Sequence, residues 1–130
     1  MEFGYTIIYV SNVQQTIDFY EKAFGFQTKF LHESSMYGEM KTGQTTLAFA
    51  ANALSEQNGL NITHNQLQNP PAGIEIAFIT DDISAAYQKA VNAGAQPLKE
   101  PTQKPWCQIV AYVRDINGVL IELCTPIQQV

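Results

Sequence analysis

Two glutamates, Glu75 and Glu122, are the residues of this chain whose type and position most directly suggest chemistry. Each lies in an alternating, strand-like run, on the face opposite the uniformly apolar positions of that run. An ionised carboxylate is buried only with a partner or a shifted pKa, so we expect this face to be wet. Two carboxylates that repel each other can leave one protonated near neutral pH, which provides a general acid or base or a site for a cationic ligand. Alternatively, Glu122 is simply hydrogen-bonded to Tyr5 or to a backbone amide.

Aromatic side chains accompany the two carboxylates. Tyr5, Ile7 and Tyr9 alternate along an early strand-like run, and Trp106 precedes a later one. Stacking on an aromatic ring is worth about 0.5–1.5 kcal/mol beyond the burial of area. The predicted ligand-binding residues are therefore Tyr5, Ile7, Tyr9, Glu75, Trp106 and Glu122. The alternative for Trp106 is that it plugs one end of the sheet.

The elements that must position these residues occur twice along the chain. Residues 5–13 align with residues 75–83, and each run is a strand that leads into the start of a helix. Ser11 or Asn12 in the first copy, and Asp81 or Asp82 in the second, have side-chain oxygens that can cap the helix. Gly25 and Gly94 are expected to end the two helices.

Three further strands are predicted after each helix, at residues 26–32, 37–41 and 45–50 and at residues 96–99, 108–114 and 119–124. We expect one domain over residues 1–130, with a first βαβββ unit at 4–50, a linker or lid at 51–73 and a second βαβββ unit at 74–126. The fold class is α+β, with the two units forming a curved mixed sheet around a cleft. The expected core positions facing the helices are Ile8, Val10, Leu47, Phe49, Ile76, Phe78, Ile121 and Leu123.

Composition excludes several classes of protein. The formal charge is -5, and the basic residues are scattered singly, so no nucleic-acid partner is expected. No apolar run approaches the length that spans a bilayer, and no secretory signal is recognisable, so we expect no membrane association and a cytoplasmic location. Cys107 and Cys124 follow no metal or redox spacing and are expected to be buried thiols; Cys107 has no suitably placed histidine to make it a nucleophile.

Several ordered motifs resemble the vicinal oxygen chelate superfamily, the group of glyoxalase I, extradiol dioxygenases and bleomycin and fosfomycin resistance proteins. These motifs are the two βαβββ units and the segments Ile17–Phe26, Tyr37–Gly43 and Pro105–Leu123. The likeness covers the whole chain apart from the linker and is closest in pattern to bleomycin-resistance-type members. In those members a similar Pro-Trp segment precedes the penultimate strand, but here Cys107 replaces the usual glycine after the tryptophan.

The resemblance also implies where a metal would be held. Metal-using members place one ligand on the first and one on the last strand of each unit, and these positions fall on Tyr5, Ala48, Glu75 and Glu122. Only the two glutamates are competent ligands, whereas a catalytic site normally supplies at least three. Neither of the two histidines, His32 and His64, matches a ligand position, so we expect no metal and no other cofactor.

The favoured hypothesis is therefore a metal-independent protein that binds or sequesters a small, flat or cationic organic molecule. The alternative is a divergent lyase or dioxygenase that uses Zn, Ni, Mn or Fe, with Glu75, Glu122 and a third ligand from outside the four family positions. A third interpretation is that the cleft is vestigial and the fold serves as a dimer module. The resemblance implies a homodimer, and it leaves open whether the cleft forms within one chain or across two.

Overall fold

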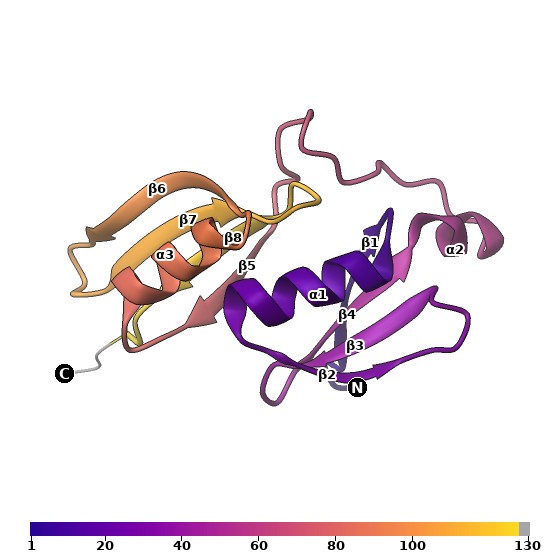
Figure 1. Cartoon of the computed structure of the whole chain (residues 1–130), viewed down its shortest axis with the longest axis horizontal. Helices are drawn as coiled ribbons and strands as arrows, with labels where there is room; N and C mark the ends of the chain where they lie inside the picture. The colour runs from indigo at the N-terminus through magenta and orange to yellow at the C-terminus, as the bar shows by residue number, and fades with distance from the viewer. Residues whose placement is uncertain (128–130) are drawn as a thin grey trace. The chain divides into compact units, whose positions relative to one another are not determined.

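The computed structural model describes residues 1–127, which form an α+β fold (Figure 1). Its elements are β1 (Tyr5–Val10), α1 (Val13–Phe24), β2 (Gln27–Leu31), β3 (Tyr37–Lys41), β4 (Thr46–Ala51), α2 (Asn52–Gln57), β5 (Glu75–Ile79), α3 (Ile83–Asn92), β6 (Gln96–Gln103), β7 (Ile109–Arg114) and β8 (Leu120–Cys124). The predicted class and both βαβββ units are confirmed. Within residues 1–127 no helix is long and apolar enough to cross a membrane.

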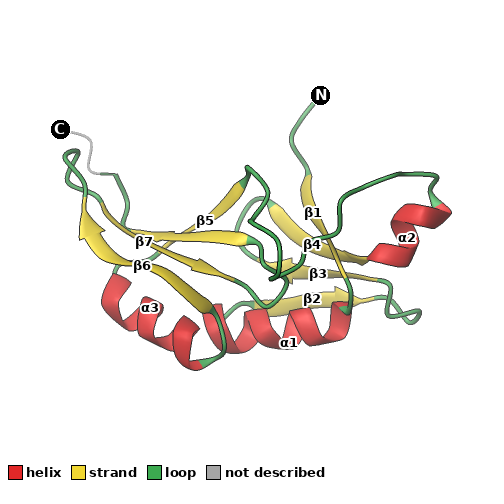
Figure 2. Ribbon diagram, turned by 90° about the horizontal axis from the view of Figure 1, so that it is seen from above, coloured by secondary structure: helices red, strands yellow, loops and turns green. Residues whose placement is uncertain are grey.

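The chain divides into two compact units, one over Met1–Asn65 and one from Gln66 onward. Each unit has its own four-stranded mixed sheet, in the order β1-β4-β3-β2 in the first and β5-β8-β7-β6 in the second. In both sheets the first and last strands of the unit pair in parallel, and the other pairs are antiparallel. Each helix lies against one face of its own sheet and leaves the other face free of helix (Figure 2).

In the first unit, capping residues mark both ends of α1. The side chain of Asn12 accepts a hydrogen bond from the backbone N–H of Gln15 at 2.9 Å, and Gly25 ends the helix in the left-handed conformation at φ 75°. The buried side of α1 includes Ile17 and Tyr20, and the ring of Tyr20 lies 4.7 Å from that of Phe49 on β4. This packing of α1 against β4 builds the core of the unit.

The second unit repeats this plan with a shorter helix. Asp82 caps α3 by accepting from the N–H of Ala85 at 3.2 Å. Because α3 lies against β6, β7 and β8, the apolar side chains of β8 are buried, whereas Ile76 and Phe78 on β5 are only half-buried. The predicted core positions therefore hold fully for β1, β4 and β8 and partly for β5.

The segment predicted as a linker is partly ordered into regular structure. Its first residues form α2, and Ser55 in this helix is buried and donates to the carbonyl of Asn52 at 2.7 Å. Farther along, the side-chain amide of Asn65 donates to the carbonyl of Tyr9 at the end of β1, at 3.0 Å. The segment is thus attached to the first unit at two places, through α2 and through Asn65.

A buried arginine holds the beginning of the second unit. The guanidinium of Arg114 donates to the backbone carbonyls of Gln66, Leu67 and Asn69, and its Nε donates to the carbonyl of Gly118 at 3.0 Å. Gly118, at φ 89°, leaves room for this arrangement, since a Cβ there would lie 2.6 Å from the guanidinium and 2.7 Å from the carbonyl oxygen of Gln66. The turn at residues 66–69 is therefore fastened by one side chain.

Strand β6 is longer than predicted, since it continues from Gln96 to Gln103 through Pro101. Proline has no N–H and is tolerated in a strand only at an edge or a bulge. β6 is the edge strand of its sheet, and its register with β7 shifts between Pro97 and Lys99 and again between Lys99 and Thr102. These irregularities accommodate the prolines.

Candidate functional site

The two glutamates singled out from the sequence meet on the helix-free face of the second sheet. Glu75 begins β5, Glu122 lies in β8, and these two strands pair in parallel. Glu122 and Glu75 are joined by a side-chain hydrogen bond. Oε1 of Glu122 also accepts from the hydroxyl of Tyr112, its register partner on β7, at 3.0 Å. The carboxyl pair is thus part of a three-residue hydrogen-bonded group.

This group shifts the acidity of its members. Partial burial, followed by the charge of Glu122 and the hydrogen bond with it, raises the pKa of Glu75 above its ordinary value of 4.5. Burial and the hydrogen bond to Glu122 raise the pKa of Tyr112 to about 12. Both shifts have the same sense, because burial first and the neighbouring charge of Glu122 second make an additional negative charge unfavourable here.

Cys124 is the last residue of β8 and lies on the same face as Glu122. It is buried, as predicted. Burial, then the hydrogen bond to Glu122, raises the pKa of its thiol to about 11, although a hydrogen bond with Gln108 acts in the opposite direction. Cys107 was predicted to be buried as well, and this is wrong, because its thiol is exposed. The residue lies in the turn before β7, with a backbone φ of 62°.

Trp106 is held in place by a chain of hydrogen bonds. Its indole N–H donates to Oε1 of Gln108 at 2.6 Å, and the amide nitrogen of Gln108 donates in turn to the carbonyl of Thr125 at 3.0 Å. Gln108 is buried, but 54% of Trp106 is exposed. The ring is therefore fixed at its polar edge and open to solvent over much of its apolar surface.

The remaining predicted residues lie on β1, on the helix-free face of the first sheet. Tyr5 and Ile7 are exposed and Tyr9 is half-buried. Ile7 is paired with Ala48 on β4, and Ala48 with Glu39 on β3. Ala48 is completely buried. It stands at a position where the resemblance implies a metal ligand, but its methyl side chain has no donor atom.

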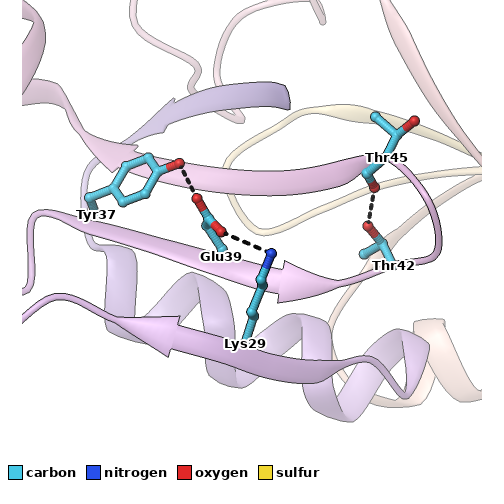
Figure 3. A network of polar contacts seen from close by, with 5 residues as sticks. All are labelled: Lys29, Tyr37, Glu39, Thr42 and Thr45. Atoms are coloured by element: carbon cyan, nitrogen blue, oxygen red, sulfur yellow. Dashed lines mark hydrogen bonds and ion pairs between the residues drawn. The ribbon is translucent and has the colours of Figure 1, made fainter. Parts of the chain in front are cut away.

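Glu39 is a site residue that the sequence analysis missed. The residue is buried, and its carboxylate accepts from the hydroxyl of Tyr37 at 2.7 Å and lies 3.6 Å from the ammonium of Lys29 on β2. Figure 3 shows Tyr37 and Lys29 converging on this carboxylate, beside the Thr42–Thr45 turn. Burial and the hydrogen bond to Glu39 raise the pKa of Tyr37 above its ordinary value, and so does the nearby Tyr5.

A signal for Glu39 was present in the sequence. Within Tyr37–Lys41, Gly38 and Met40 alternate with Tyr37 and Glu39, and a Cβ at Gly38 would lie against Ile17 of α1. Alternation along this middle strand therefore places Tyr37 and Glu39 on the helix-free face. Tyr112 was likewise not among the predicted site residues, although the same alternation along β7 places it on the helix-free face.

The residues present do not fit a metal ion of the kind that the family uses. In the first unit the two family positions hold the phenol of Tyr5 and the methyl of Ala48, and in the second unit Glu122 is already engaged by Glu75 and Tyr112. Among residues 1–127 there is no group of three or more His, Cys, Asp or Glu side chains that could hold a metal. His32 instead shares a hydrogen bond with the hydroxyl of Ser34 at 2.8 Å, within a turn.

Comparison with known families identifies this arrangement. The family model of the glyoxalase/bleomycin resistance protein/dioxygenase superfamily matches residues 2–123. The chain belongs to this superfamily. The resemblance inferred from the sequence motifs is thereby confirmed. No curated protein matches the chain.

Several solved structures share the fold of this chain. A glyoxalase-related enzyme from Fulvimarina pelagi matches with a TM-score of 0.82 at 18% identity, over 97% of this chain and 88% of the other. A glyoxalase/bleomycin resistance protein/dioxygenase family enzyme from Burkholderia phytofirmans PsJN matches with a TM-score of 0.80 at 20% identity, over 96% and 98%. TioX from Micromonospora sp. ML1 matches with a TM-score of 0.73 at 15% identity, over 96% and 98%. At these identities the likeness concerns the fold.

Proposed function

We propose that this chain binds a small, flat organic cation without a metal, in the manner of a sequestering protein. The observation that carries the proposal is the exposed indole of Trp106, anchored through Gln108 in the same unit as the acidic pair Glu75 and Glu122. A plug would be buried, whereas Trp106 is 54% exposed. Because the ring is already held in place, binding a ligand against it costs little side-chain entropy.

The acidic pair supports a cation as the ligand. Partial burial first, and then the charge of Glu122, raise the pKa of Glu75, and a positive group nearby would stabilise the ionised carboxyls against both. Glu122 already has two hydrogen-bonding partners, Tyr112 and Glu75, and this supports a site that works without a metal. The chain is further proposed to act as a cytoplasmic homodimer, and exposed apolar residues such as Phe3, Ile74 and Ile79 support an interface between copies.

Calorimetric titration with ethidium, a flat organic cation, tests the proposal. We expect binding that weakens about tenfold in Trp106→Ala and only slightly in Trp106→Phe, because phenylalanine retains an aromatic face. Titration with Ni, Zn, Mn or Fe(II) is expected to give no tight uptake and no thermal shift. Stoichiometric metal binding at micromolar concentration that Glu122→Gln abolishes would overturn the proposal in favour of a metal-dependent lyase or dioxygenase.

A further inference from the structure

The first unit contains an anionic group that neither the family comparison nor the acidic pair accounts for. Glu39 is buried, yet within residues 1–127 only its Oε2 has a close partner, the hydroxyl of Tyr37 at 2.7 Å. Its Oε1 faces the ammonium of Lys29 at 3.6 Å, which is beyond hydrogen-bond length. A carboxylate can accept about four hydrogen bonds, so this oxygen retains capacity for a closer donor.

The cationic partner of Glu39 is half exposed to solvent. The side chain of Lys29 is 51% exposed, whereas that of Glu39 is 9% exposed. Because one partner is half exposed and the separation is beyond hydrogen-bond length, this pair contributes less free energy than a close, fully buried pair would: the ammonium stays hydrated, and its side chain loses entropy when it is held. A ligand cation can therefore replace Lys29 and leave the charge beside Glu39 unchanged.

Apolar and aromatic side chains surround this carboxylate on the helix-free face of the first sheet. Phe30 is the register partner of Glu39 on β2, and its ring lies 6.0 Å from that of Tyr37. Tyr5, Ile7 and Phe30 are exposed although they are large and apolar. We call Tyr5, Ile7, Phe30, Tyr37 and Glu39 together the Glu39 face. It combines a fixed negative charge with aromatic surfaces, a combination that attracts organic cations.

We propose that the Glu39 face binds an organic cation whose N–H donors are attached to a flat apolar body, such as an aryl amidine or guanidine. The cationic end donates to Oε1 of Glu39 in place of Lys29, and the flat body covers Phe30 and Tyr5. The hydrogen bond from Tyr37 keeps the carboxylate oriented. This inference rests on the proposed function, the binding of a small organic cation. It adds Glu39 as the group that selects the ligand by its charge.

Charge favours a cation over an anion or a neutral ligand here. An anion that approached Lys29 would also approach the buried carboxylate, which lies 3.6 Å from the ammonium. The formal charge of the whole chain, -5, acts in the same direction. A neutral ligand would gain the aromatic contacts alone and would leave the loose ion pair as it is.

Benzamidine, with benzamide as its neutral counterpart of nearly the same shape, provides the test. Titration of the full chain followed by 1H–15N NMR is expected to shift the amides of Phe30 and Glu39 with benzamidine and not with benzamide. Glu39→Gln should weaken benzamidine binding about tenfold or more, since a charge-assisted hydrogen bond is lost. Glu33→Gln, which removes an exposed carboxylate of the same unit, is the control and should leave the affinity unchanged.

Lys29→Met keeps the proposal testable if Glu39→Gln does not fold. Removing the competing ammonium should tighten benzamidine binding about threefold, and weaker or unchanged binding would overturn the inference. Equal binding by Glu39→Gln, or equal binding of benzamide, would also overturn it. If Glu122→Gln abolishes benzamidine binding and Glu39→Gln does not, the cation binds in the second unit. This result would overturn the inference about Glu39 but would agree with the proposed function. Shifts of the same amides with protein concentration alone would mean that a second copy covers the face, which also overturns it.

Discussion

The guanidinium of Arg114 lies 2.7 Å from the backbone carbonyl oxygen of Asn69, and this hydrogen bond joins strand β7 to the turn that starts the second unit. Arg114 is the single arginine of the chain, and it faces carbonyl groups instead of a carboxylate. A charged donor that satisfies several carbonyls at once fixes the loop more firmly than separate surface contacts would. The consequences for stability can be measured.

Replacing this arginine is expected to loosen the turn. Arg114→Met keeps much of the buried aliphatic volume but leaves the carbonyls of Gln66, Leu67 and Asn69 without their donor, which should lower the free energy of unfolding by about 2–3 kcal/mol. Arg114→Lys should recover only part of this loss, because an ammonium cannot reproduce the planar fork. Urea unfolding measures the stability of both variants. An ordinary surface substitution changes the free energy of unfolding by about 0.5 kcal/mol or less, so a loss no larger than this in Arg114→Met would contradict the structural role.

A side chain at Gly118 should be poorly tolerated for two separable reasons. The backbone there has φ 89°, and a Cβ would lie 2.6 Å from the guanidinium of Arg114 and 2.7 Å from the carbonyl oxygen of Gln66. Gly118→Ala is therefore expected to cost about 2–4 kcal/mol in thermal or urea unfolding. Gly43→Ala is the matched control, since Gly43 also has a positive φ, 116°, but has no atom within 4 Å of the added Cβ. If the two variants lose the same stability, the close approach to Arg114 contributes nothing.

The two thiols should react at very different rates. Cys107 is exposed, whereas Cys124 is buried and has a pKa of about 11. At pH 8 only about a thousandth of the Cys124 thiol is ionised, and the thiolate is the reactive form. An aromatic disulfide reagent should therefore label one thiol per folded chain quickly and the second only after unfolding. Cys107→Ser should remove the fast phase, and fast labelling that persists in this variant would place a reactive thiol at Cys124.

The acidic pair predicts a dependence of stability on pH. Because the pKa of Glu75 is higher in the folded chain than its ordinary value of 4.5, the folded state holds this proton more tightly than the unfolded state does. Its contribution to stability is complete below pH 4.5 and is lost as the pH rises through the folded pKa. Glu75→Gln removes this loss, so relative to the natural chain it should gain stability between pH 4 and pH 8.

The expected gain for Glu75→Gln is about 0.2–1 kcal/mol, the range of partly exposed charge pairs. Urea unfolding of both chains at the two pH values measures it, because the difference between them cancels the titration of the other carboxyls. Glu100→Gln, an exposed carboxyl of the same unit, makes the same change in net charge and should show no such gain. A gain in Glu100→Gln as large as in Glu75→Gln would attribute the effect to net charge alone.

Local chemistry explains which parts of the fold were predictable. Asn12, Gly25 and Asp82 act within one helical turn, so their residue types alone predict the helix ends that the structure shows. Alternation along β8 likewise placed Glu122 on the open face, because the period of a strand is a local property. The extension of β6 through Pro101 was not predictable in this way, since it depends on the strand lying at the edge of its sheet.

The partners of the site residues depend on strand register, which a single sequence does not reveal. Tyr112 meets Glu122 because β7 and β8 pair in one register, and a shift by one residue would turn its hydroxyl to the helix side. The bulge between Thr28 and Phe30 changes this face in addition, because it makes Phe30 the register partner of Glu39, where the unbroken register from Thr28 and Met40 would place Lys29 alone. Alternation therefore predicts a face, and the register decides which residues touch on it.

The parallel pairing of the first and last strands in each unit also has a consequence for how the chain is made. Tyr5 pairs with Thr46 and Glu75 with Leu120. The first strand of each unit, β1 or β5, therefore has no strand to pair with until the last strand of that unit, β4 or β8, has been synthesised. Such distant pairings slow folding, because the entropy of loop closure is lost before the contact forms. During synthesis the apolar β1 therefore emerges well before β4, and the nascent chain carries an unsatisfied edge until the first unit closes.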